Sequence, residues 1–247
     1  ELSPPQIAEA LISRLKGLTD VSAFESRLAI IRKSFNYKGQ PSPVARMPHY
    51  CSGCPHNTST VVPDGSRGLG GIGCHYMVMW QPTRNTKTFT QMGGEGVTWI
   101  GQSPFTDEKH IFVNLGDGTY FHSGLLAIRA AVSANVNITY KILYNDAVAM
   151  TGGQHVDGEL SVPMIIDQVR AEGVKNVIVM SDDTTKYTDK QVVIPSNIRV
   201  EHRNDLDKVQ REMREMPGVS VLIYDQTCAA EKRRRRKRGL MVDPAKS

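Results

Sequence analysis

Residues 111–154, IFVNLGDGTYFHSGLLAIRAAVSANVNITYKILYNDAVAMTGGQ, decide the expected fold of this 247-residue chain. Apolar segments typical of buried β-strands end at Gly116-Asp117-Gly118 and again at Asn145-Asp146. About 25–30 residues separate these two ends, which is enough for one helical crossover between parallel strands. The crossover places an acidic and an amide side chain at the carboxyl ends of neighbouring strands, where open α/β sheets bind ligands.

The alternation of strands and helices continues along the chain. Apolar segments predict strands at 111–115, 138–144, 176–180, 199–201 and 219–224. Amphipathic segments predict helices at 122–134, 162–171 and 206–216. Strands rich in Val, Ile and Leu that alternate with helices indicate an α/β fold, with a doubly wound, mostly parallel sheet and helices on both faces.

The chain divides into three expected parts. Residues 1–45 form a helical connector or docking arm, because Ser3-Pro4-Pro5-Gln6 has a capping-box pattern and apolar residues follow at helical spacing. Residues 46–228 form the α/β domain. Residues 36–73, which extend into the start of this domain, are rich in Gly, Pro, Ser and Asn and are predicted to be dominated by loops. Residues 229–247 form a basic tail that links to the next module.

The formal net charge of +5 reflects one local feature, the run KRRRRKR at 232–238, without whose seven cations the balance would be 5 − 7 = −2. The globular body is therefore not broadly basic, which argues against nucleic acid as a partner. The chain begins without Met or a secretory signal and has no apolar run long enough to cross a membrane. We therefore expect a cytoplasmic protein without membrane association, cut from a longer chain.

Asp117 and Asn145 suit a divalent cation that holds a diphosphate. Mg²⁺ prefers octahedral oxygen coordination at roughly 2.1 Å and is commonly held by one or two protein groups together with phosphates. The Asp117 carboxylate, the Asn145 amide oxygen and the backbone carbonyl of Ala147 could supply such ligands. Gly116 and Gly118 would let the backbone approach a phosphate, whose charge a helix N-terminus favours. The alternative is that the two polar groups only cap turns.

A second informative set consists of the four cysteines Cys51, Cys54, Cys74 and Cys228. In a cytosolic protein, a C-x-x-C pair with two further cysteines indicates metal or redox chemistry more often than disulfides. Four thiolates suit either a [4Fe–4S] cluster or a tetrahedral Zn²⁺ ion, and the spacing leaves both open. His56 and His75 lie beside these cysteines in the sequence, either as hydrogen-bonding neighbours of a cluster or as packed loop residues.

The sequence G-D-G followed by a crossover and Asn resembles the diphosphate and Mg²⁺ motif of thiamine diphosphate enzymes. Residues 151–154, TGGQ, narrow the resemblance to the 2-oxoacid:ferredoxin oxidoreductases. The resemblance implies a thiamine diphosphate-binding fold, with Mg²⁺ on Asp117, Asn145 and the Ala147 carbonyl. It also implies a set of cofactor-binding residues: Gly116, Asp117, Gly118, Thr119, Asn145, Ala147, Thr151, Gly152, Cys74 and His75.

The cysteines match the same family, whose thiamine domain carries a C-x-x-C pair, a third cysteine further along and a fourth near the end of the domain. In that family these four residues bind one [4Fe–4S] cluster, which here implies the ligands Cys51, Cys54, Cys74 and Cys228. The surrounding sequences CSGCPH, GIGCH and CAAEKRRRRKRG look most like the indolepyruvate-type members in their long, fused bacterial form.

The resemblance implies that the full enzyme oxidatively decarboxylates an aryl 2-oxoacid with coenzyme A as co-substrate and reduces ferredoxin. Pyrimidine-binding and ferredoxin-like domains of the same enzyme are the implied partners, in a homodimer. No catalytic residue is assigned in this chain, because the glutamate that activates the cofactor comes from the pyrimidine-binding domain. Glu95, in the glycine-rich segment 92–96, is expected to be structural. The chain alone is therefore expected to lack turnover.

Two other functions remain open from the sequence. The first is a non-redox thiamine diphosphate-dependent decarboxylase or synthase, in which the cysteines are incidental. The second is a zinc-stabilised, basic-tailed binding module, in which G-D-G is only a turn. The run 232–238 is interpreted as a solvated segment that faces a partner, and its cations could guide an acidic ferredoxin. His122 is equally consistent with a first-turn helix residue and with a cofactor contact.

Overall fold

A computed structural model describes residues 3–36, 47–147, 150, 153, 158 and 160–242. The chain forms two compact units, Glu1–Met47 and Pro48–Ser247. In the first unit, helix α1 (Pro4–Leu15) packs against helix α2 (Ser22–Asn36). The predicted capping pattern is present, since the backbone N–H of Ser3 donates to Gln6 Oε1 at 2.8 Å. The role of this unit as a connector or docking arm stays a prediction.

Within the described residues, the second unit contains a seven-stranded sheet in which all neighbouring strands are parallel. In sheet order the strands are β2 (Thr86–Phe89), β1 (Gly68–Gly70), β3 (Ile111–Gly116), β4 (Ile138–Tyr144), β7 (Val219–Asp225), β5 (Asn176–Ser181) and β6 (Arg199–His202). Because β3 and β4 are direct neighbours, their carboxyl ends meet at one edge of the sheet, as predicted.

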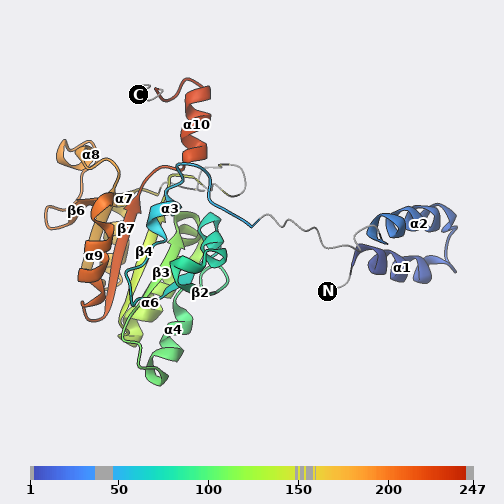
Figure 1. The fold of residues 1–247 in the computed structure, drawn as a ribbon, viewed down its shortest axis with the longest axis horizontal. Helices are drawn as coiled ribbons and strands as arrows, with labels where there is room; N and C mark the ends of the chain where they lie inside the picture. Colours follow the sequence, from blue (N-terminus) through green and yellow to red (C-terminus); the bar gives the residue numbers. More distant parts are fainter. Residues whose placement is uncertain are drawn as a thin grey trace. The chain divides into compact units, whose positions relative to one another are not determined.

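Helices cover both faces of this sheet, as Figure 1 shows. The longer ones on the faces are α6 (Leu125–Ala134), α7 (Val162–Ala171) and α9 (Leu206–Arg214), whereas α10 (Ala229–Lys237) stands beyond the carboxyl edge of the sheet (Figure 1). The shorter ones are α3 (His56–Ser59), η1 (Cys74–Trp80), η2 (Pro82–Arg84), α4 (Val97–Gln102), η3 (Ser103–Phe105), α5 (Asp117–Thr119), η4 (Tyr120–Gly124), α8 (Thr185–Thr188) and η5 (Arg203–Asp205). No helix in the described part of the chain is long and apolar enough to cross a membrane.

Two apolar cores lie on opposite faces of the sheet. Alternate residues of the strands, such as Ile142 in β4 and Ile223 in β7, pack with α4, α6 and α7 on one face. On the other face Leu143 and Leu222 pack with α9. Successive strand residues point to opposite faces, so a sheet buried on both sides needs continuous apolar strands. The predicted doubly wound α/β fold is confirmed, and the sheet is entirely parallel in the described residues.

Strands β1 and β2 were not predicted, and β1 lies in the stretch that was expected to be loop-dominated. Its sequence, Gly-Leu-Gly, has low strand propensity, so the sequence pattern indicated a turn. Glycine leaves room for the neighbouring strand there. A Cβ atom at Gly68 would lie 2.6 Å from Thr86 Oγ1 of β2, so a larger residue would force the threonine side chain to move.

Two helical segments also differ from expectation. The helix predicted from residue 122 begins earlier, at Asp117, and passes through the π-helical turn η4 before continuing as α6. The segment expected to form an exposed basic tail folds as α10 through Lys237. Glu231 and Arg235 are four residues apart, a spacing at which opposite charges attract on a helix, and they form an ion pair. The role of residues 229–247 as a linker stays a prediction.

Lys141 is a fully buried cation in β4, on the face that packs against α9. Its Nζ donates to the backbone carbonyl of Val61 at 2.8 Å and to Gln210 Oε1 at 3.0 Å. Burial, with a smaller contribution from Arg84, lowers the pKa of Lys141 from 10.5 to about 7. The neutral oxygens around the amine compensate only part of the cost of its desolvation.

This buried lysine makes stability depend on pH. Because its folded-state pKa is lowered, the unfolded chain binds more protons between pH 7 and 10.5, and the free energy of unfolding should rise with pH across that window. We expect Lys141→Met to remove most of this rise, on the order of a few kcal/mol, in urea unfolding measured at several pH values. Lys175→Met, at an exposed lysine, is the matched control. Equal pH profiles for the two variants would contradict the prediction.

Candidate functional site

The Asp117 carboxylate joins the carboxyl ends of β3 and β4. Its Oδ1 accepts a hydrogen bond from the backbone N–H of Gly118 at 2.8 Å. Its Oδ2 accepts from the backbone N–H groups of Asn145 at 2.8 Å and of Asp146 at 3.1 Å. Burial raises the pKa of Asp117 to about 6, while the three N–H donors oppose this effect. The carboxylate therefore fixes the turn after β4 in position next to the start of α5.

Asn145 presents an unpaired oxygen at this edge. The residue is 7% exposed, and its Oδ1 is buried without a hydrogen-bond partner among the described residues. An unsatisfied buried polar atom costs roughly 1–3 kcal/mol, which a cation could offset. The next residue, Asp146, has a left-handed backbone with φ of 59°, and Ala147 after it is buried. Carboxylate, amide and carbonyl oxygens close together are the donor set that Mg²⁺ prefers.

His75 lies against the backbone of the predicted diphosphate loop. A Cβ atom at Gly116 would be 3.1 Å from His75 Cε1, so the glycine lets the ring lie close to the strand end. Thr119 Oγ1 donates to the backbone carbonyl of Ile72 at 3.2 Å, which ties the start of the helix to the segment before Cys74. Burial lowers the pKa of His75 to about 3, and its Nε2 is a buried atom without a partner in the described chain.

The four cysteines line one cavity of about 60 Å³. Asn145 lines the same cavity, together with His56 and residues at the start of α10. All four thiols are free, and burial raises the pKa of Cys54 to about 11. The described side chains include no group of three His, Cys, Asp or Glu residues already arranged to hold an ion. The fit therefore rests on the chemistry of the donor set: four thiols around one cavity suit iron–sulfur or zinc ligation.

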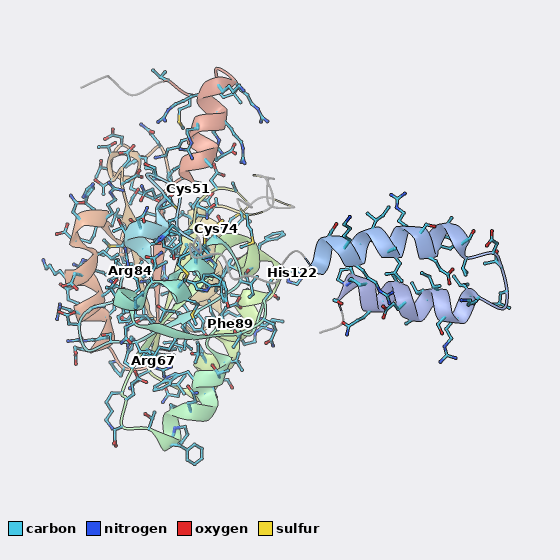
Figure 2. All side chains as sticks on the ribbon, turned by 45° about the vertical axis from the view of Figure 1, so that its right-hand side comes forward. Cys51, Arg67, Cys74, Arg84, Phe89 and His122 are labelled. Carbon is cyan, nitrogen blue, oxygen red and sulfur yellow. The ribbon has the colours of Figure 1, made fainter. Side chains whose placement is uncertain are left out.

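Cys51 lies near the beginning of the second unit in the sequence and Cys228 near its end, and both line the cavity. The backbone N–H of Cys54 donates to the carbonyl of Cys51 at 3.0 Å, and Gly53, between them, has a left-handed φ of 72° that allows this tight turn. The backbone N–H of Cys228, which precedes α10, donates to the carbonyl of Asn145 at 3.1 Å. Figure 2 shows Cys51 and Cys74 near the base of α10, whereas Arg67 lies toward the other end of the sheet.

The other predicted residues, two histidines and a glutamate, differ in their exposure to solvent. His56 is buried, with its ring centroid 5.7 Å from that of His75, and it lines the cavity. His122 is exposed in the π-helical turn, where its Nδ1 lies 2.8 Å from Ser123 Oγ. Glu95 is fully buried, and its Oε2 accepts from the Gly93 N–H at 2.7 Å. Thr151 and Gly152 lie outside the described residues.

Sequence reasoning missed the contacts of α10 with this site. Arg235 Nη2 lies 2.7 Å from Asp146 Oδ2, directly beside Asn145, and Arg235 Nε lies 3.3 Å from Glu231 Oε1. The cationic run was interpreted only as a solvated surface. The spacing of Glu231 and Arg235 was a signal for a helix, but nothing local indicated which part of the body that helix contacts.

A comparison with models of protein families identifies the class of enzyme to which the chain belongs. The family model described as "Thiamine pyrophosphate enzyme, C-terminal TPP binding domain" matches residues 71–224. This range includes β3, β4, the Asp117 carboxylate and the Asn145 oxygen. The chain therefore belongs to the thiamine pyrophosphate enzymes and carries their cofactor-binding domain.

Two curated proteins are similar in sequence to most of this chain. Over 212 residues the chain is 27% identical to "Indolepyruvate oxidoreductase subunit IorA" of Thermococcus kodakarensis, covering 76% of this chain and 30% of that protein. A protein of the same name from Methanothermobacter marburgensis is 28% identical over 261 residues, covering 98% of this chain and 38% of that protein. The chain thus spans about a third of the length of these curated relatives.

A solved structure agrees at the level of the fold. The 2-oxoglutarate:ferredoxin oxidoreductase of Magnetococcus marinus superposes with a TM-score of 0.51 at 20% identity, covering 75% of this chain and 65% of that one. The predicted thiamine diphosphate-binding domain is confirmed, because the family model covers residues 71–224.

The unpaired amide oxygen of Asn145 gives a direct test of the diphosphate site. Asn145→Leu removes a buried atom without a partner, so the Tm of the ligand-free chain should stay level or rise. Mg²⁺ and thiamine diphosphate should stabilise the unchanged chain by about 2.7 kcal/mol at a hundredfold excess over Kd, which raises its Tm, and this increase should be lost in the variant.

Asn114→Leu is the matched control, because both side-chain polar atoms of Asn114 are also buried without partners, in β3 and ahead of the diphosphate loop. It should have a similar effect on the ligand-free chain and keep the ligand-induced increase. If Asn145→Leu keeps that increase, Asn145 is not a ligand of the metal.

Proposed function

We propose that this domain binds thiamine diphosphate through Mg²⁺ and carries a [4Fe–4S] cluster, within an enzyme that oxidatively decarboxylates aryl 2-oxoacids of the indolepyruvate type. Coenzyme A is the proposed co-substrate and ferredoxin the electron acceptor. The observation that carries this proposal is the cavity lined by all four cysteines, because Asn145 belongs to its wall. The proposed cluster ligands and the proposed metal–diphosphate site would therefore adjoin one another.

The diphosphate end of the cofactor would be held at the edge formed by β3 and β4. Asp117, Asn145 and the Ala147 carbonyl are the proposed Mg²⁺ ligands. Gly116, Gly118 and Thr119 would contact the diphosphate from the start of the α5 segment, and Thr151 and Gly152 would complete the contacts. These residues hold and orient the cofactor, and none of them is proposed to react.

Thiamine diphosphate supplies a nucleophilic carbon and an electron sink for the decarboxylation of a 2-oxoacid. An iron–sulfur cluster supplies one-electron transfer to an external carrier. Cys74 and His75 are adjacent in the chain and face the two sites: Cys74 lines the cysteine cavity, and the His75 ring lies against Gly116. We assign Cys74 as the cluster ligand nearest the cofactor.

We propose that another domain of the enzyme activates the cofactor. Glu95 is held in the interior by its bond to the Gly93 N–H and lies beside Gly71, so we keep it as a structural residue. A pyrimidine-binding domain would supply the activating glutamate and a ferredoxin-like domain would carry electrons onward, within a homodimer. The chain by itself is then expected to lack turnover.

Metal and sulfide analysis of the anaerobically purified chain tests the proposal. About four iron and four sulfide per chain, with broad absorbance near 400 nm, are expected. Replacing Cys228 by Ser should reduce this content, because it removes one of the four thiols. Zinc in place of iron would support the zinc-stabilised module, and no metal would support a non-redox thiamine enzyme. Measurable 2-oxoacid oxidation by the chain alone would contradict the domain assignment.

The exposed cations of α10 suit an acidic electron carrier. Arg233, Lys237 and Arg238 are exposed, and the helix begins directly after Cys228. Charge complementarity between such surfaces raises association rates at low salt. We expect the variant R233E/K237E/R238E to slow ferredoxin reduction by the assembled oxidoreductase at low ionic strength, with a smaller effect at high salt. An unchanged dependence on ionic strength would contradict this role.

A further inference from the structure

Helix α10 is fastened to the carboxyl edge of the sheet. Lys232 Nζ lies 3.1 Å from Asp182 Oδ2, in the segment after β5. Glu231 is buried, and it accepts hydrogen bonds from Arg234 at 3.2 Å and from Arg235 at 3.3 Å. The cationic run is therefore not a free chain end, since part of it makes specific contacts with the body of the domain.

Two of the contacts of α10 converge on one turn. At the start of the helix, the backbone N–H of Cys228 donates to the carbonyl of Asn145 at 3.1 Å. Two helical turns later, Arg235 Nη2 lies 2.7 Å from Asp146 Oδ2 and 3.4 Å from the Asp146 carbonyl oxygen. The helix thus holds the turn at 145–147 at two points, one of which is a cysteine that lines the thiol cavity.

This turn carries two of the proposed ligands of the metal–diphosphate site. Asp146 lies between them and adopts a left-handed backbone, with φ of 59°. Such a backbone is uncommon for a residue other than glycine, although Asp adopts it more readily than most residues do. Asp146 also places a carboxylate next to the site proposed for a diphosphate, and Arg235 compensates its charge.

The helix also lies close to Gly153, one residue of the second stretch that carries the family resemblance. Gly153 has a left-handed φ of 82°, and a Cβ atom at that position would collide with the Arg234 guanidinium and come within 2.8 Å of Glu231 Oε2. A glycine at this position therefore leaves room for these two side chains of α10.

We propose that Arg235 is a positioning residue for the metal–diphosphate site, and that it couples occupancy of the four-cysteine cavity to the binding of thiamine diphosphate. This inference rests on the proposed function. A cluster that binds Cys228 fixes the start of α10, which holds Arg235 on Asp146 and keeps the Asn145 and Ala147 oxygens in place. By thermodynamic linkage, binding of the cofactor must then stabilise the cluster by the same factor.

The test compares Arg235→Gln with Arg233→Gln, an equal change of charge at an exposed residue of the same helix. The Kd of thiamine diphosphate with Mg²⁺ is measured by calorimetry on cluster-loaded and cluster-free forms of the full chain. The unchanged chain and Arg233→Gln should bind about tenfold more tightly when loaded. Arg235→Gln should bind more weakly and lose this difference, with an unchanged iron content at the start of the measurement.

A second variant separates positioning from general damage to the fold. Asp146→Asn removes the ion pair and keeps a residue that tolerates the left-handed backbone. The double variant R235Q/D146N should be no weaker than either single variant, because both remove the same contact. In the reciprocal measurement, saturating cofactor should slow the decay of cluster absorbance in the unchanged chain and not in Arg235→Gln.

The outcomes distinguish the inference from the function on which it rests. Equal cofactor affinity in loaded and cluster-free forms of the unchanged chain, or equal behaviour of Arg235→Gln and Arg233→Gln, overturns the coupling and leaves the proposed function standing. Absence of cofactor binding, or of iron and sulfide, in the unchanged chain overturns the proposed function, and the coupling with it.

Discussion

The buried carboxylate of Asp117 is the constraint on which the rest of the site depends. It accepts three backbone N–H groups, one from its own helix start and two from the turn after β4. A buried anion is stable only when such donors surround it. That requirement joins two strand ends that are far apart in sequence, and it fixes the backbone of Asn145, whose side-chain oxygen is buried without a partner among the described residues. The same turn then gives Cys228 and Arg235 their hydrogen-bond acceptors.

The proposed metal–diphosphate site and the four-thiol cavity adjoin because the residues of both lie at the carboxyl edge of one parallel sheet. Asp117 and Asn145 follow β3 and β4, and Cys228 follows β7, the neighbour of β4. In a parallel sheet these segments emerge on the same side. Cys74 comes shortly after β1, and Cys51 and Cys54 come from the segment that precedes α3.

Much of the fold followed from periodicity, because strands buried on both faces must be continuously apolar. The strands from β3 onward and helix α7 lie where the sequence predicted them. Strand β1 was not predicted because glycine has low strand propensity, although the short distance to Thr86 leaves little room for a side chain at Gly68. No local sequence pattern predicted the π-helical turn after Asp117 either.

Residue types and local spacing identify the residues that carry the chemistry and their order: an acid after one strand, an amide after the next, and four cysteines whose spacing fits both iron–sulfur and zinc ligation. They do not reveal that the cysteines and Asn145 line one cavity, that the Asn145 oxygen has no partner among the described residues, or that the basic run is a helix bound to Asp146. Such contacts join residues far apart along the chain, and packing of the whole domain, which local propensity does not encode, places them together.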